Sequence, residues 1–360
     1  MTARREDTVR REDDAPDASD RLPGVSYVMP VLNEAGYVEP AVRSILAQQY
    51  PGPTEIVLAL GPSTDKTDEI VARLQREDPR IRTVANPGTD IPIGLNLAIR
   101  AGRHPVVVRV DAHTELPAGY TRQAVTTLLE QDAANVGGIM VAVGAPGFQS
   151  AVARAYNSPL GLGGGAYHSS DARAGEAESA YLGVMRADAL ADVGYFNESL
   201  RRGEDWELNF RLRAAGHKVW LDPSLRVNYW PRSTWTALVR QFWATGVWRG
   251  ELVRRLHRRN SARFFAPPAL VVATGAAVVL VPVAVGIGGG AVTAAAVVST
   301  AGPVAYLALL AAVAARGEGS AADRARLCGV LSTMHYAWGA GFLLGIARGA
   351  KDSVDTSRAG

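Results

Sequence analysis

The chain has 360 residues, enough for one large domain or two ordinary ones, and its formal charge of +3 is too small to indicate nucleic-acid binding. A single cysteine, Cys328, excludes an intramolecular disulfide framework and a zinc site built from cysteines. Residues 1–23 mix charges without an apolar stretch, so the sequence predicts a disordered N-terminal tail there, neither a signal peptide nor part of a core.

Residues 24–232 alternate strand-like and helix-like segments, which is the pattern of a mainly parallel α/β sheet flanked by helices. Runs of apolar and β-branched residues predict strands over residues 24–34, 54–61, 81–86 and 105–113. Apolar residues spaced three and four apart predict helices over residues 37–50, 63–77 and 91–102. In such sheets ligands gather at the carboxyl ends of the strands. The sequence places these residues there: Asn33, Glu34, Gly61, Asp111 and His113.

The fourth predicted strand ends in two chemically active residues. The segment "VRVDAHTEL" (Val108–Leu116) is rich in valine and then reaches Asp111 and His113. Carboxylate and imidazole groups are costly to bury unless they are paired or bound to a metal. The pattern therefore indicates ligands presented at the end of a strand, and a strand that stops in a polar turn is the alternative interpretation.

The second half of this region is less regular. A glycine-rich segment over residues 161–170 fits either a loop that approaches a phosphate or a plain flexible connection. Glu204, Asp205 and Glu207 stand at the start of a predicted amphipathic helix. Carboxylates are favoured in a first helical turn by the helix dipole, so the residues alone leave both a catalytic and a capping role open.

The remaining residues indicate a membrane. Residues 233–263 combine tryptophans with an arginine-rich polar face, which is typical of an amphipathic helix lying in the headgroup layer. Residues 264–347 are predicted to form a transmembrane region. Its three apolar segments of spanning length are predicted over residues 264–287, 291–315 and 327–347.

Charge distribution indicates the orientation of these segments. The arginines that precede the first span favour a catalytic region on the cytoplasmic face of the cell membrane. Three crossings would leave the C-terminal tail, residues 348–360, outside, although it carries Arg348 and Lys351. Either the tail departs from the rule or one segment does not cross fully, and the sequence leaves this open.

Five passages together resemble glycosyltransferase family 2, whose members have the GT-A nucleotide-binding fold. They are "VMPVLNE" (28–34), "GPSTDKT" (61–67), "GLNLAIRAG" (94–102), "DAH" (111–113) and "GYFNESLRRGEDWELNFRLRAAG" (194–216). The resemblance is to membrane-attached enzymes that build bacterial exopolysaccharides such as succinoglycan, and "MHYAWGAGFLLG" (334–345) fits that branch. It implies a GT-A catalytic domain over residues 24–232 and an inverting transfer of a sugar from a nucleotide-diphosphate sugar to a lipid-linked or glycan acceptor.

The resemblance also implies roles for individual residues. Asp205 would be the base that deprotonates the acceptor hydroxyl, with Glu204 and Glu207 as further catalytic candidates. Asp111 and His113 would hold Mn²⁺ or Mg²⁺, which stabilises the departing diphosphate. Contacts with the nucleotide sugar are expected from Pro30, Leu32, Glu34, Gly61, Asp65, Asn96, Asp111 and Gln241.

Two departures from the family pattern shape this expectation. Leu60 stands where the family keeps an aspartate that binds the nucleotide base, and leucine cannot accept a hydrogen bond. The Gln-x-x-Arg-Trp motif of processive synthases is absent around Gln241, which favours transfer of a single sugar.

Two other functions compete with this one. A catalytically inactive GT-A-like scaffold in a polysaccharide assembly is the alternative; Leu60 and His113 favour it, whereas Asp111, Asp205 and Glu207 argue against it. A nucleotidyltransferase is disfavoured, because residues 28–40 contain no glycine- and arginine-rich phosphate loop.

Overall fold

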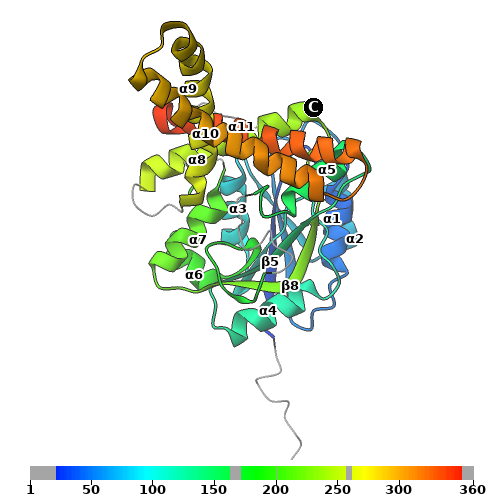
Figure 1. The fold of residues 1–360 in the computed structure, drawn as a ribbon. Helices are drawn as coiled ribbons and strands as arrows, with labels where there is room; N and C mark the ends of the chain where they lie inside the picture. The colour runs from blue at the N-terminus through cyan, green and yellow to red at the C-terminus, as the bar shows by residue number, and fades with distance from the viewer. Residues whose placement is uncertain (1–21, 163–171, 201, 257–261, 351–360) are drawn as a thin grey trace, which may run out of the picture.

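The computed structural model of the chain describes residues 22–162, 172–200, 202–256 and 262–350. All but the last two residues of the predicted N-terminal tail lie outside the described residues, and so does most of the glycine-rich segment 161–170. In Figure 1 a sheet flanked by helices forms the lower part of the molecule, and long C-terminal helices lie across its top and project beyond it.

The sheet has eight strands within the described residues, in the order β3-β2-β1-β4-β7-β5-β8-β6. Its first half is parallel, as the alternation of strands and helices predicts, and consists of β1 (Val25–Val31), β2 (Thr54–Leu60), β3 (Ile81–Ala85) and β4 (Val106–Arg109). Its second half mixes directions, because β7 runs antiparallel to both β4 and β5, whereas β8 is parallel to β5 and antiparallel to β6. These strands are β5 (Asn135–Ala142), β6 (Gly175–Glu176), β7 (Tyr181–Arg186) and β8 (Val219–Tyr229).

Helices cover both faces of the sheet because the strands are apolar on both sides. Along β1, Tyr27 and Met29 enter one core and Val28 enters the opposite one, as the two-residue period of a strand requires. The first core is closed by α1 (Val38–Leu46), α2 (Thr67–Glu77) and α4 (Tyr120–Glu130). The second is closed by α3 (Ile91–Ala101), α6 (Ala187–Asp192) and α7 (Glu204–Ala214). The predicted mixed α/β fold with flanking helices is confirmed.

A third core joins the sheet to the C-terminal helices. It is built from β5 and from the helices α5 (Phe148–Tyr156), α8 (Trp235–Leu256) and α11 (Ala321–Arg348). On α8, Phe242 and Trp248 are buried, whereas Trp235 and Trp243 remain 44 % and 41 % exposed. The aromatic residues of the predicted interfacial segment therefore face two different environments.

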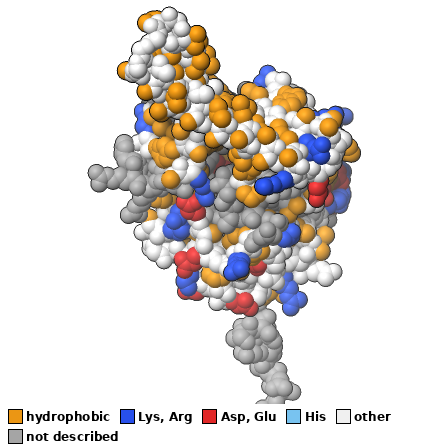
Figure 2. All heavy atoms as spheres, viewed as in Figure 1, with side chains coloured by type: hydrophobic (Ala, Val, Ile, Leu, Met, Phe, Trp, Pro, Cys, Tyr) orange, Lys and Arg blue, Asp and Glu red, His pale blue; other side chains and the backbone are white. Residues whose placement is uncertain are grey.

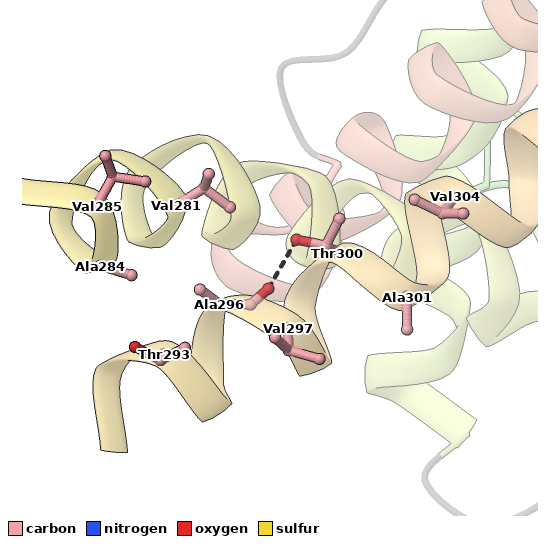
Figure 3. Close-up of a pocket in the computed structure, with 9 residues that line it drawn as sticks. All are labelled: Val281, Ala284, Val285, Thr293, Ala296, Val297, Thr300, Ala301 and Val304. Carbon is pink, nitrogen blue, oxygen red and sulfur yellow. Dashed lines mark hydrogen bonds between the residues drawn. The ribbon is translucent and has the colours of Figure 1, made fainter. Parts of the chain in front are cut away.

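The helices α9 (Ala266–Ile287) and α10 (Gly290–Arg316) follow a short 3₁₀ turn, η3 (Ala262–Phe265), and form a hairpin that projects from the domain (Figure 1). Figure 2 shows hydrophobic side chains gathered over this projection. In Figure 3, residues such as Val281, Val285, Val297 and Val304 line an apolar groove between the two helices. Within the described residues, α9, α10 and α11 are each long and apolar enough to cross a bilayer, in agreement with the three predicted segments.

Candidate active site at the carboxyl edge of the sheet

The loops that follow β1 and β2 are tied to each other by hydrogen bonds. The Asp65 carboxylate accepts from the backbone N–H groups of Ala35 (3.1 Å) and Thr67 (3.0 Å), and the Thr67 hydroxyl accepts from the N–H of Glu34 (2.8 Å). The hydrogen bond from the Thr67 hydroxyl lowers the pKa of Asp65, which favours its ionised form. Asp65 thus fixes the backbone that carries Glu34.

The other expected contacts of this region lie on the same edge. The Gly61 N–H donates to the Val31 carbonyl (2.8 Å), which holds the ends of β1 and β2 together. A Cβ atom at Gly61 would come within 3.1 Å of the Leu32 side chain, and one at Gly94 would come within 3.0 Å of Pro30. Pro30 therefore faces α3, whereas Leu32 lies beside Gly61 at the strand ends.

The strand β4 stops at Arg109, so that Asp111 and His113 lie in the turn beyond it. The Asp111 backbone carbonyl accepts a hydrogen bond from the Thr114 N–H (2.9 Å), which closes this turn. The guanidinium of Arg109 reaches Asp111 Oδ1 through Nε and Nη2, both at 3.1 Å. Sequence reasoning extended this strand to His113, four residues beyond its observed end, and did not single out Arg109.

Arg109 brings Asp111 together with the start of α7. Its side chain is only 6 % exposed, and it also contacts Glu204 Oε1 (Nη2, 3.3 Å) and Asp205 Oδ1. Three carboxylates from two distant segments thus share one guanidinium, which leaves the group with a formal surplus of two negative charges when all are ionised. We call these residues the Arg109 cluster: Arg109, Asp111, Glu204 and Asp205.

The cluster changes the acidity of Asp205. Although 44 % of the Asp205 side chain is open to solvent, partial burial, together with the charges of Glu204 and Asp111, raises its pKa to about 7, against the opposing effect of Arg109. A carboxyl group poised near neutrality can hold or release a proton under ordinary conditions, which is the property required of a general base.

Glu207 has a different environment from its two acidic neighbours. Both of its carboxylate oxygens accept hydrogen bonds from Arg211, each at 2.8 Å. Arg211 also donates to the backbone carbonyls of Val193 and Tyr195. Glu207, which sequence reasoning grouped with the catalytic candidates, is thus engaged in holding a turn and makes no hydrogen bond within the Arg109 cluster among the contacts found in the described residues.

His113 faces Glu34 across the site, with 3.5 Å between Nδ1 and Oε1. Both side chains are partly exposed, so they are accessible from solvent. Among the described residues, no group of three or more His, Cys, Asp or Glu side chains is arranged to hold a metal ion. Asp111 and His113 offer one carboxylate and one imidazole, and this fits a divalent cation such as Mn²⁺ that accepts both and completes its coordination with substrate phosphates and water.

Asn96 and Gln241, both expected to contact the nucleotide sugar, make hydrogen bonds within the protein instead. The Asn96 amide donates to the Phe196 carbonyl (2.9 Å) and to Glu198 (2.8 Å), while its oxygen accepts from the Phe196 N–H (3.0 Å). Asn96 therefore fastens α3 to the segment that precedes α7. Gln241 lies between the hydroxyl groups of Tyr156 (3.2 Å) and Tyr229 (3.3 Å), where it links α8 to α5 and β8.

Sequence reasoning missed two residues of the site, Arg109 within the cluster and Tyr181 beside it. Arg109 carried a detectable signal, because an arginine inside a valine-rich strand requires a buried anionic partner. Tyr181 on β7 carried none, because a tyrosine in a strand is ordinary. Burial raises the pKa of Tyr181 well above its usual value, and the charge of Asp111 adds to this effect, so its hydroxyl remains protonated beside the acidic group.

Comparison with known proteins identifies the family. The sequence model described as "Glycosyl transferase family 2" matches residues 26–183. The succinoglycan biosynthesis protein ExoA of Rhizobium meliloti (strain 1021) is 35 % identical over 233 residues, which cover 64 % of this chain and 70 % of that protein.

Two further proteins extend the comparison to other organisms. A dolichyl N-acetyl-α-D-glucosaminyl phosphate 3-β-D-2,3-diacetamido-2,3-dideoxy-β-D-glucuronosyltransferase of Methanococcus voltae is 22 % identical over 241 residues, covering 64 % of this chain and 74 % of that protein. The mannosyltransferase PcManGT of Pyrobaculum calidifontis, solved with GDP-Man and Mn²⁺, superposes with a TM-score of 0.54 and 19 % identity, covering 94 % of this chain and 91 % of that one. The predicted GT-A fold with apolar C-terminal helices is therefore confirmed, and the chain belongs to glycosyltransferase family 2.

Proposed function

We propose that this protein is an inverting, metal-dependent glycosyltransferase that moves one sugar from a nucleotide-diphosphate sugar to a lipid-linked or glycan acceptor at the membrane. The observation that carries this proposal is the Arg109 cluster. It joins the strand end that would bind the diphosphate to the carboxylate that would receive the acceptor proton.

On the donor side, Asp111 and His113 would hold a divalent cation, with the diphosphate completing its coordination. Such a cation stabilises the negative charge that develops on the departing nucleoside diphosphate. The similar fold that was solved with GDP-Man and Mn²⁺ makes this chemistry a reasonable expectation here. Glu34, Gly61 and Leu32 line the same edge and would contact the nucleotide, while Asp65 holds the backbone in place.

On the acceptor side, Asp205 would take the proton of the attacking hydroxyl. In a single displacement the acceptor oxygen bonds to the anomeric carbon on the face opposite the leaving diphosphate, so the anomeric configuration inverts. The O–H proton passes to Asp205, and the electron pair of the broken glycosyl bond leaves with the diphosphate. Arg109 would hold Asp205 and Asp111 in register, as a positioning residue that acts through these two carboxylates.

The membrane helices support an acceptor carried at the membrane, and the curated relative in succinoglycan biosynthesis supports a role in polysaccharide synthesis. Leu60 ends β2 in place of the usual aspartate, which supports a different contact with the nucleotide base. Nucleotide sugars with several different bases are therefore to be compared as donors.

The proposal is tested by comparing Asp205→Asn with Glu207→Gln in the purified full-length protein. A panel of UDP-, GDP- and dTDP-sugars is first screened by calorimetry for Mn²⁺-dependent binding, and transfer is then followed with the donor that binds. We expect Asp205→Asn to bind the donor nearly as the parent does and to lose transfer by at least about 100-fold, the range of general-base catalysis. Glu207→Gln, once folded, should retain most of its turnover.

Two results would contradict this proposal. Parental turnover in Asp205→Asn would remove that residue as the base. Donor binding by the parent protein without transfer to any membrane-extracted acceptor would favour the inactive scaffold.

A further inference from the structure

The helix α11 matches α9 and α10 in length and apolar character but is placed differently. In its most apolar stretch 39 % of the residues are buried, against 0 % for α9 and 6 % for α10. From Leu327 to Gly345, no residue of α11 is exposed. We infer that α11 does not cross the bilayer but lies in the membrane plane, packed on the sheet domain, which is the eight-stranded sheet with helices α1 to α8. The α9–α10 hairpin alone crosses. The C-terminal end of α11 therefore stays on the same side of the membrane as the sheet.

Both ends of α11 are held by polar groups of the sheet domain. Before its first residue, the Glu318 carbonyl accepts a hydrogen bond from Arg154 of α5 (3.0 Å). After its last residue, Gly349 lies against the ion pair of Glu251 and Arg254 on α8, where a Cβ atom would come within 3.0 Å of the Glu251 carboxylate. A helix of 28 residues is about 42 Å long, more than the roughly 30 Å of a hydrocarbon core. A crossing α11 could not keep both ends at the same domain.

The middle of α11 is also part of the protein core. Val330, Leu331 and Met334 are almost fully buried in the third core, beside Met140 of β5. Next to Met334, His335 Nε2 lies 2.8 Å from the Leu160 carbonyl in the segment that follows α5. Contacts with the sheet domain therefore continue along α11 rather than stopping at one end.

The C-terminal half of α11 is locked to α8 by facing glycines. Gly246 and Gly250 of α8 meet Gly341 and Gly345 of α11, and a Cβ atom at any of these four positions would overlap the backbone of the opposite helix. Small residues four apart permit this close approach. A crossing α11 would therefore bring α8 into the bilayer as well.

The charges of α8 make such an insertion costly. The helix carries Arg240, Arg249, Glu251, Arg254 and Arg255. Each of these side chains would cost about 3 kcal/mol at the centre of a bilayer. By contrast, α9 has no charged residue and α10 has only Arg316, at its C-terminal end.

A membrane crossing by the hairpin alone agrees with the distribution of positive charge along the chain. With only the hairpin crossing, Arg316, Arg324 and Arg348 all lie on the side of the sheet domain, as the positive-inside rule favours for a cytoplasmic face. The partner of the α8–α11 layer is the headgroup region of the bilayer. Trp235 and Trp243 on α8 remain exposed in that layer, and tryptophan is enriched at this depth of a membrane.

Single-cysteine labelling of the full chain tests the inference. In a Cys328→Ala background, a membrane-impermeant maleimide is applied to sealed inside-out and right-side-out vesicles carrying Ala291→Cys, Glu318→Cys or Ser357→Cys. These positions lie at the start of α10 next to the α9–α10 turn, between α10 and α11, and in the C-terminal tail. We expect Glu318→Cys and Ser357→Cys to react in one vesicle orientation and Ala291→Cys in the other.

Reaction of Ser357→Cys from the same side as Ala291→Cys would overturn the inference, because α11 would then cross. Reaction of all three from one side would overturn it as well, because the hairpin would then not cross. Each variant is first checked for extraction as a folded, monodisperse protein in detergent. Since labelling reports position alone, the outcome does not depend on the proposed sugar transfer.

Discussion

Three of the arginines that bind carboxylates in this molecule lie in three different environments. Arg109 is 6 % exposed and faces three carboxylates, Arg211 is 26 % exposed and faces one, and Arg73 is 41 % exposed and bridges α1 and α2 at the surface. The Arg211 pair is balanced in charge, and so is the surface network, in which Arg43 and Arg73 meet Glu39 and Glu77.

Among these three environments, only that of Arg109 contains more acidic groups than arginines. Collecting buried like charges is unfavourable for folding by itself, because desolvation and mutual repulsion both oppose it. A surplus of negative charge at the edge of a sheet is instead what a site for a cation requires. The comparison teaches that charge balance, more than the presence of acidic residues, separates the Arg109 cluster from the pair of Arg211 and Glu207.

The largest effect is expected from Arg109→Met, which keeps the length of the side chain but removes the charge. Three carboxylates would lose their common partner, and breaking a buried ion pair costs roughly 3–5 kcal/mol of folding free energy. Thermal denaturation and the transfer assay should show lowered stability together with loss of turnover. Parental stability would show that Arg109 does not hold the cluster.

A smaller effect on stability, without loss of the chemistry, is expected from Arg211→Met. Glu207 and two backbone carbonyls would lose their donor, but all these groups lie outside the Arg109 cluster. We expect a loss of about 2 kcal/mol, within the range for partly buried charged groups left unsatisfied. Turnover per folded molecule should stay within about threefold of the parent, and a drop as large as that of Asp205→Asn would erase the distinction between the two groups.

Asp111→Asn addresses the surplus charge directly. It removes one negative charge and weakens a metal ligand while the side-chain volume is nearly unchanged. Mn²⁺-dependent nucleotide affinity should fall about tenfold or more, about 1.4 kcal/mol. Calorimetry with and without Mn²⁺ separates this loss from any metal-independent binding, and an unchanged Mn²⁺ dependence would exclude Asp111 as a ligand.

The smallest effect is expected from Arg73→Met, the matched substitution at the surface. Exposed ion pairs contribute about 0–1 kcal/mol because water and salt screen them. Thermal denaturation should therefore change little, and the difference from the parent should shrink further at high salt. A loss as large as that of Arg109→Met would mean that burial does not distinguish these arginines.

The sequence predicts the fold better than the site. Runs of apolar residues predicted the parallel strands β1 to β4, and apolar residues spaced three and four apart predicted the helices between them, because local pattern and burial agree there. The meeting of Asp111 with Asp205 followed from the family resemblance, since no local rule connects residues so far apart.

Other features depended on tertiary contacts that no pattern contains. Glu204 and Glu207 occupy one helical turn and look equivalent in sequence. In the structure Glu204 binds Arg109, whereas Glu207 binds Arg211. Composition alone likewise does not decide whether α11 faces lipid or protein, because this depends on the neighbours of an apolar helix. The hydrogen bonds between the Asn96 side chain and the Phe196 backbone could not be predicted either, because the two residues are far apart in the sequence.

The hydrogen bonds of Asp65 and Thr67 to the loop after β1 have a consequence for how the donor is recognised. These hydrogen bonds hold the loop after β1 in place without a ligand, so a nucleotide that binds beside it does not have to order the loop and loses less binding free energy. Replacing the hydroxyl by Thr67→Val is then expected to slow capture and loosen retention of the donor, although the Thr67 side chain is itself fully buried.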